Sequence, residues 1–380
     1  MKYETIMEID LNKLKNNTKL LCKSYNDYKY KMADLKDYGH GLGLKIADVL
    51  YKNGINYVIV GSLKEALEIR KFNTEVNILV NYFVTEDEIY DCINNNIAIT
   101  IYNLDYLQIL NNLELKDQIK LHILIDNGSN LLGINKKEEF KDSLDIINNN
   151  KYLDLEGIYT ELTSSGVEDE YYYHQMNNFY KIIKDNLNDD VIIHLNEPVM
   201  YHKKLDYLNG IRFDLSILGI EENINDDFFT NLRIKNVEKK YNDLEFPDVD
   251  LELVFNITSE VMCIKKVKKG SLVGRNYVAK DDMFVAIIPI GHKDGITKAI
   301  KYVGIDKFKR NILSDEIDRL VVEVTEDVKE KDKVYILNEE RGIYDFLTLL
   351  KTNRYYLMSV LNRNLTRVYI NDSEENHNLL

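Results

Sequence analysis

A lysine with an aromatic residue and glycines just beyond it is the part of this chain best suited to covalent chemistry. Lys36 follows the largely apolar run of residues 32–35, which predicts a β-strand that ends on the lysine. An amine at the carboxyl end of a strand can form a Schiff base with an aldehyde cofactor, and the turn at Gly39 can approach a phosphate closely. A solvated loop lysine has the same local sequence, so both interpretations stay open at this point.

The elements that must position this lysine alternate between strand-like and helix-like runs over the first 220 residues. The strand candidates are residues 56–60, 76–80, 98–101, 119–125, 155–160 and 191–194. The segments between them are charged and have helical spacing, which is the pattern of βα units around a parallel sheet. A (β/α)8 barrel is the natural closure at this length, although composition alone also allows a doubly wound sheet.

After about residue 225 the pattern changes to strands joined by short turns. The candidates are residues 254–267, 272–278, 283–290, 320–324 and 333–336. We therefore predict an α/β chain with two domains: a TIM-type (β/α)8 barrel over residues 1–228 and a mostly β domain over residues 229–380.

Composition narrows the class of protein. The 380 residues are 45% hydrophobic and 29% charged, which is typical of a globular protein with a real core. A net charge of -14 argues against a nucleic-acid partner, and no apolar run is long enough to span a membrane. Three widely spaced cysteines and the lack of an apolar N-terminal segment favour a reducing cytoplasm. No spacing such as His-x-x-x-His indicates a metal site.

The segment around Lys36 resembles the N-terminal signature of the alanine racemase family, Val-Val-Lys-Ala-Asn-Ala-Tyr-Gly-His-Gly. Further ordered matches to the family lie in residues 7–11, 61–70, 126–133, 175–179, 212–219, 288–295, 352–355 and 367–369. This resemblance decides between the two sheet architectures in favour of the barrel. It also implies pyridoxal 5'-phosphate as cofactor, a small amino acid as substrate and a homodimer.

The resemblance gives roles to particular residues. Lys36 is expected to bind the cofactor and to act as one catalytic base, Tyr38 and Tyr355 to bind its phosphate, and Arg212 to face its pyridine nitrogen. The loop after Lys36 is two residues shorter than in the family. A gapless alignment would instead place Asp34 at the lysine position, and a carboxylate cannot form an imine. We favour Lys36, because deletions fall more easily in loops than in strands.

Racemisation needs a base on each face of the Cα–H bond. The family's second base, a tyrosine from the partner subunit, falls at His292, and a family histidine on the fifth barrel strand falls at Glu161. Imidazole can carry a proton near neutral pH. We predict that Glu161 orients His292 and pairs with Arg212. Ile317 and Asp318 correspond to the substrate pocket, with Ile317 in place of a methionine.

Other departures favour the loss of activity. Asp214 replaces a glycine beside the phosphate, and Glu197 lies near the position of a phosphate-binding serine. Leu124 and Leu131 replace a lysine and the arginine that it supports. Two functions therefore remain: an amino-acid racemase that uses pyridoxal phosphate, or an inactive paralogue with a binding or regulatory role. The sequence leaves open the substrate side chain and whether His292 takes over the role of the tyrosine.

Overall fold

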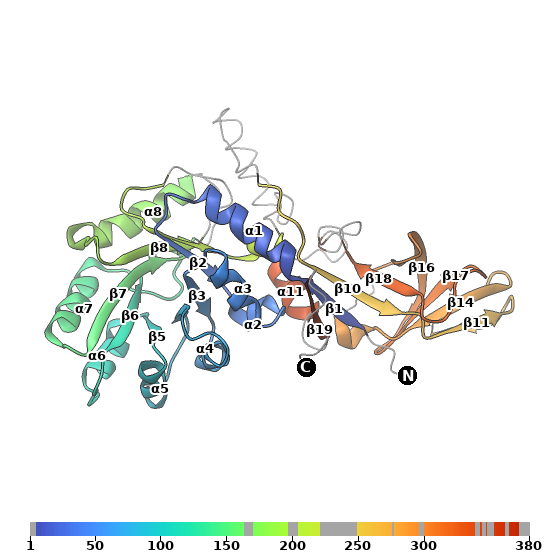
Figure 1. The fold of residues 1–380 in the computed structure, drawn as a ribbon, viewed down its shortest axis with the longest axis horizontal. Coiled ribbons are helices and arrows are strands. Elements are labelled where there is room, and N and C mark those ends of the chain that lie inside the picture. The colour runs from blue at the N-terminus through green and yellow to red at the C-terminus, as the bar shows by residue number, and fades with distance from the viewer. Residues whose placement is uncertain are drawn as a thin grey trace. The chain divides into compact units, whose positions relative to one another are not determined.

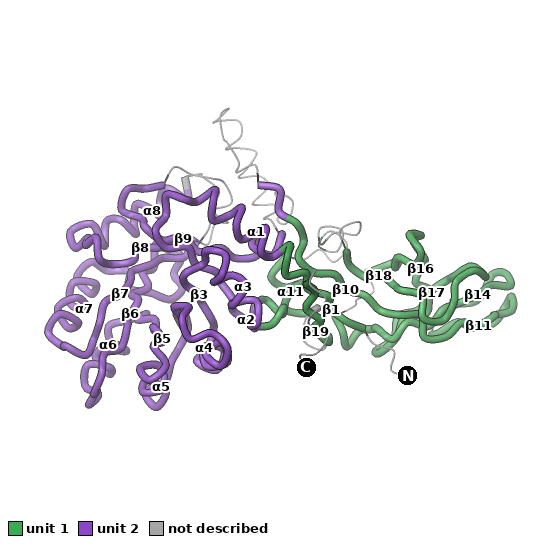
Figure 2. The backbone as a smooth tube through the Cα atoms, viewed as in Figure 1, with its two compact units in different colours: residues 1–13, 40–43, 252–380 green, residues 14–39, 44–251 purple. Residues whose placement is uncertain are grey.

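The computed structural model describes residues 5–162, 170–196, 204–220, 249–275, 277–295, 300–338, 343, 347, 353–361 and 365–371. The chain divides into two compact units (Figure 2). Unit 1 comprises Met1–Lys13, His40–Gly43 and Glu252–Leu380, and unit 2 comprises Leu14–Gly39 and Leu44–Leu251. The predicted boundary at residue 228 lies outside the described residues and stays a prediction.

Unit 2 is a closed barrel of parallel strands with helices around it (Figure 1), which confirms the predicted TIM-type fold. In order around the barrel, the strands are β2 (Tyr30–Asp34), β3 (Tyr57–Val60), β4 (Asn77–Val80), β5 (Ile97–Ile101), β6 (Ile119–Leu124), β7 (Leu153–Thr160), β8 (Ile192–Asn196) and β9 (Gly210–Phe213). The α-helices up to β9 are α1 (Leu11–Ser24), α2 (Lys36–His40), α3 (Ile46–Lys52), α4 (Leu63–Arg70), α5 (Ile89–Asn94), α6 (Leu104–Asn111), α7 (Lys137–Asn149) and α8 (Glu170–Ile183). The 3-10 turns of this unit are η1 (Glu86–Glu88), η2 (Lys184–Asn186) and η3 (Leu215–Leu218).

The barrel interior is filled by alternate residues of its strands, as the two-residue period of a strand requires. One buried cluster consists of Met32, Tyr57, Ile59, Leu79, Ala98, Leu124, Tyr159 and Ile192. Two buried histidines join this interior, and neighbouring glycines make room for them. A Cβ atom on Gly210 would lie 2.7 Å from the Cβ of His194, and a Cβ on Gly157 would clash with the ring of His122.

Unit 1 is built on a nine-stranded sheet, which confirms the predicted mostly β domain. Its order is β11 (Cys263–Val267), β14 (Met283–Ile288), β17 (Leu320–Val324), β16 (Phe308–Asp315), β15 (Tyr302–Ile305), β18 (Lys333–Leu337), β10 (Phe255–Glu260), β1 (Ile6–Asp10) and β19 (Thr366–Ile370). A separate two-stranded sheet pairs β12 (Leu272–Val273) with β13 (Tyr277–Val278), and the remaining elements are η4 (His292–Asp294) and α11 (Arg354–Leu361). The predicted strands over residues 254–267 and 272–278 are each in fact two strands, and β1, β15, β16 and β19 were not predicted.

The predicted strand that ends on Lys36 is wrong at its carboxyl end. β2 ends at Asp34, and Lys36 opens the short turn α2. Asp37, Tyr38 and Gly39 then have φ values of 53°, 56° and 66°, in the left-handed region that side chains disfavour by about 1–2 kcal/mol per residue. The chain therefore leaves the sheet two residues earlier than the apolar run suggests. Within the described residues, no helix is long and apolar enough to cross a membrane.

Candidate active site at the barrel mouth

Lys36 and Asp34 form an ion pair at the carboxyl end of β2. The Nζ atom of Lys36 lies 2.9 Å from Oδ2 of Asp34, and the backbone N–H of Lys36 donates to Oδ1 of the same carboxylate at 3.0 Å. Asp34 is nearly buried, whereas the Lys36 side chain is 38% exposed. One carboxylate thus holds both the amine and the start of the turn, at the barrel face where TIM-barrel enzymes carry their active sites.

The electrostatic surroundings of Lys36 are acidic. Burial opposes the charge of the Lys36 amine, but Asp34, Glu161 and Asp214 outweigh it and raise its pKa above the usual range. The amine is therefore an ammonium ion at neutral pH and must lose a proton before it can act as a nucleophile or a base.

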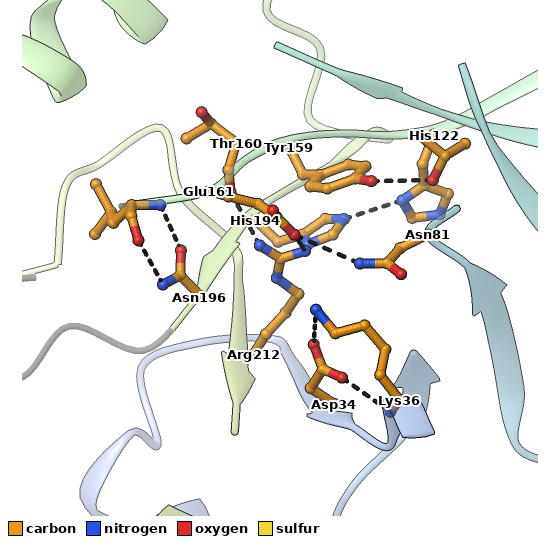
Figure 3. A network of polar contacts seen from close by, with 12 residues as sticks. Asp34, Lys36, Asn81, His122, Tyr159, Thr160, Glu161, His194, Asn196 and Arg212 are labelled. Carbon is orange, nitrogen blue, oxygen red and sulfur yellow. Dashed lines mark hydrogen bonds and ion pairs between the residues drawn. The ribbon is translucent and has the colours of Figure 1, made fainter. Parts of the chain in front are cut away.

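Arg212 on β9 points to the same end of the barrel (Figure 3). Its side chain is 2% exposed, and its guanidinium lies 4.8 Å from the centre of the Tyr159 ring. Nη2 donates to the carbonyl of Thr160 at 3.0 Å, and Nη1 lies 3.5 Å from Oε1 of Glu161. Among the described residues, the buried Nε–H of Arg212 has no hydrogen-bond partner. A buried donor of this kind is costly to leave unsatisfied, so it indicates a missing acceptor.

A compact acidic turn supports the segment after Lys36. Ser62 caps α4, and the carboxylate of Glu65 accepts hydrogen bonds from the backbone N–H groups of Gly61 and Tyr38, at 2.9 Å and 2.7 Å. The Tyr38 side chain lies near Lys64, whose Nζ is 5.9 Å from the centre of the ring. Glu65 thus fixes the left-handed turn, and Tyr38 stands beside a positive charge.

A polar chain that was not predicted from the sequence runs through the barrel interior. His122 and His194 contact each other through Nδ1 and Nε2 at 3.0 Å, and Nε2 of His122 lies 3.1 Å from Oε2 of Glu156. The Tyr57 hydroxyl donates to the same oxygen at 2.5 Å. Burial, together with Arg212 and His122, holds the pKa of His194 well below its usual range, so this ring is neutral. The available signal was the position of the two histidines, since His122 on β6 and His194 on β8 both occupy inward positions of their strands.

The other predicted site residues lie in unit 1. Nε2 of His292 is 2.6 Å from Oδ2 of Asp315, a partner that was not predicted from the sequence. Ile317 is 64% exposed, and Asp318 pairs with Arg319 at 2.8 Å. Tyr355 is 45% exposed. Their roles stay predictions, as does the proposed contact between Glu161 and His292.

Two of the residues that differ from the family pattern lie in described parts of unit 2. Leu124 is buried in the barrel interior, whereas Leu131 is 71% exposed. Glu197 and Thr352 lie outside the described residues. In the described part of the chain, no three His, Cys, Asp or Glu side chains are arranged so that they could hold a metal ion.

The chain matches the family model of the alanine racemase N-terminal domain over residues 9–197 and that of the C-terminal domain over residues 254–369. It belongs to the alanine racemase family. Among curated alanine racemases, it is 29% identical to that of Borreliella burgdorferi (strain ZS7), over 95% of this chain and 96% of the relative. It is 26% identical to that of Clostridium tetani (strain Massachusetts / E88), over 96% of this chain and 95% of the relative.

Solved structures agree with this assignment. The alanine racemase of Clostridium difficile 630 superposes with a TM-score of 0.84 at 25% identity, and the match covers 97% of this chain and 96% of that one. A histidine racemase from Leuconostoc mesenteroides superposes with a TM-score of 0.82 at 18% identity, over 97% of this chain and 98% of that one. The second likeness is evidence for the fold alone.

Two groups at the barrel mouth of this alanine racemase family member fit pyridoxal phosphate. Lys36 supplies an amine for the aldehyde, and the buried, unsatisfied Nε–H of Arg212 is a donor for a ring nitrogen. The fit is poorer for the phosphate, because Asp214 adds a half-buried carboxylate to a mouth that already holds Asp34 and Glu161. The aldehyde and ring ends of the cofactor would thus have partners.

Proposed function

We propose that this chain is a pyridoxal-phosphate-dependent amino-acid racemase, with Lys36 as the residue that binds the cofactor and as one catalytic base. Membership of the alanine racemase family supports the reaction class. The observation that carries the proposal is the presence, at one barrel mouth, of the Lys36 amine and of a buried Arg212 Nε–H that has no hydrogen-bond partner among the described residues. The names of the curated relatives favour alanine or another small amino acid as the substrate.

When bound, pyridoxal phosphate supplies an electron sink that acidifies the Cα–H bond of an amino acid. Arg212 would hold the ring nitrogen by donating from Nε, and because an arginine has no proton to give up at neutral pH, it would leave this nitrogen unprotonated. Glu161 and the Thr160 carbonyl fix the guanidinium. Lys36, once deprotonated, removes or returns the Cα proton on one face.

His292 from a second copy of the chain is the base that we propose for the opposite face. Asp315 accepts from Nε2–H of His292, which leaves Nδ1 to take up or release a proton. Tyr38 and Tyr355 would bind the phosphate, and Ile317 and Asp318 would line the substrate pocket. The proposal includes a homodimer. It also includes a location in the cytoplasm, which the three free cysteines favour.

Deuterium exchange tests the proposal. The purified chain is incubated with pyridoxal phosphate and L-alanine, then with other L-amino acids, in deuterated water. The expected result is deuterium at Cα together with the D-enantiomer by chiral chromatography. Lys36→Ala should abolish both signals, whereas Lys71→Ala, which removes an exposed lysine at the end of α4, should leave them unchanged. No exchange with any amino acid would contradict the proposal.

A specific observation favours an inactive paralogue as the second candidate. The last residue of β2 is Asp34, and this aspartate binds the Lys36 amine. If the strand-end position is the one that must carry the cofactor, the chain has a carboxylate there and cannot form the bond. In that case pyridoxal phosphate produces no visible absorbance band with the protein, and deuterium exchange is absent as well.

A further inference from the structure

We propose that Asp34 is a positioning residue for Lys36: its carboxylate holds the Nζ atom as an ammonium ion at the end of β2 and restricts the reaction of this amine with aldehydes to alkaline pH. The inference deepens the proposed function and rests on it for the identity of the aldehyde. The protonation of Lys36 itself can be measured without any cofactor.

The geometry makes Asp34 the dominant partner of the amine. Its Oδ2 atom lies 2.9 Å from Nζ of Lys36, and its Oδ1 atom accepts from the backbone N–H of the same residue at 3.0 Å. Because the carboxylate is fixed at both oxygens and nearly buried, it cannot swing away at low cost. Gly61 lies beside the Lys36 stem, where an added Cβ would be 3.7 Å from Cγ of Lys36.

The net charge of the surrounding groups acts in the same direction. The groups that face Lys36 are Glu65 on α4, Glu161 after β7, Arg212 on β9 and Asp214 after β9. Three are acidic, and the charge of Arg212 is partly offset by Glu161 at 3.5 Å. Burial alone would favour the neutral amine, so the raised pKa of Lys36 comes from carboxylates: Asp34 contributes most, followed by Glu161 and Asp214.

The protonation state of Lys36 Nζ determines when this amine can react with an aldehyde. Lys36 must first give its proton to solvent, and only then can the Nζ lone pair attack the aldehyde carbon. The C–N bond forms, the two protons that remain on Nζ pass to the aldehyde oxygen, and this oxygen leaves as water while the C=N bond forms. Below the pKa of the amine, each unit by which that pKa is raised lowers the free-amine fraction tenfold.

Competitive acetylation with limiting acetic anhydride tests the inference, because the reagent modifies only free amines. Labelling of the Lys36 peptide is compared with that of surface lysines by mass spectrometry from pH 7 to pH 11. Asp34→Asn keeps the size of the side chain and an acceptor for the backbone N–H. It should raise Lys36 labelling at pH 8 by about tenfold or more, because an opposite charge at this distance shifts a pKa by about 1–3 units. Asp37→Asn removes an exposed charge next to Lys36 in sequence and should leave labelling unchanged.

Three outcomes decide the matter. A shift of the labelling midpoint to lower pH in Asp34→Asn, restored by Asp34→Glu, supports the inference. An unchanged profile overturns it, and so does a uniform rise at every pH, which would indicate only greater access. The same proteins are mixed with pyridoxal phosphate at pH 8. Faster growth of a visible band in Asp34→Asn links the inference to the proposed function. If labelling shifts but no protein forms a band, the proposed function fails and the role of Asp34 stands.

Discussion

Glu156→Gln tests whether the polar chain inside the barrel stabilises the fold. Burial opposes the charge of Glu156, but hydrogen bonds from His122, Tyr57 and Lys120 lower its pKa from 4.5 to about 2. Because the Glu156 carboxyl binds a proton less tightly in the folded state than in the unfolded state, its ionisation stabilises the fold above the unfolded pKa. The contribution is lost as the pH falls from about 5 to about 2. A shift of this size corresponds to about 3 kcal/mol at pH 7 and about 1 kcal/mol at pH 3.

Urea unfolding at pH 7 and pH 3 measures this contribution, because urea does not screen charges. The free energy of unfolding of Glu156→Gln should be lower than that of the wild type by about 3 kcal/mol at pH 7 and by about 1 kcal/mol at pH 3. The matched control is Glu139→Gln, which breaks a surface pair with Lys136 and should cost less than about 1 kcal/mol at both pH values. A deficit of Glu156→Gln that is equal at the two pH values would refute the reasoning.

Two further predictions concern Gly157 in the barrel interior and Arg212 at the barrel mouth. Gly157→Ala should lower the free energy of unfolding by about 1–3 kcal/mol, because its methyl group clashes with the ring of His122. Thermal unfolding checks this prediction. The control is Gly304→Ala, where the nearest neighbour of the new methyl is 3.5 Å away, and equal melting temperatures of the two variants would contradict the prediction. Arg212→Lys should weaken pyridoxal phosphate binding about tenfold or more, since a hydrogen bond to a charged group contributes about 1.5–3 kcal/mol. An absorbance titration measures this, and an unchanged affinity would show that the Nε–H is not the donor.

Much of the barrel was predictable because its strands are short apolar runs buried on both faces. Residues 56–60 and 76–80 differ from β3 and β4 by one residue at one end. β9 was not identified as a strand, because it has four residues and one of them is Arg212. The actual end of β2 could not be seen either, because the chain leaves the sheet through a left-handed turn that Glu65 stabilises from a distant segment.

The candidate site was predictable only in part. Lys36, Arg212 and Glu161 were identified from the family pattern, and the structure brings them to one barrel mouth. Contacts that depend on the three-dimensional path of the chain were not predicted. Asp34 was considered only as a rival to Lys36, and Asp315 was not considered as a partner of His292. Local sequence does not show which carboxylate a side chain will meet.

Covalent trapping is the most direct test of the claim that Lys36 is the amine that binds the cofactor. The protein is mixed with pyridoxal phosphate at alkaline pH, reduced with borohydride and digested, and the modified lysine is located by peptide mass spectrometry. We predict a single modified site at Lys36, which is lost in Lys36→Ala. No modified peptide, or modification spread over surface lysines with Lys36 untouched, would contradict the account.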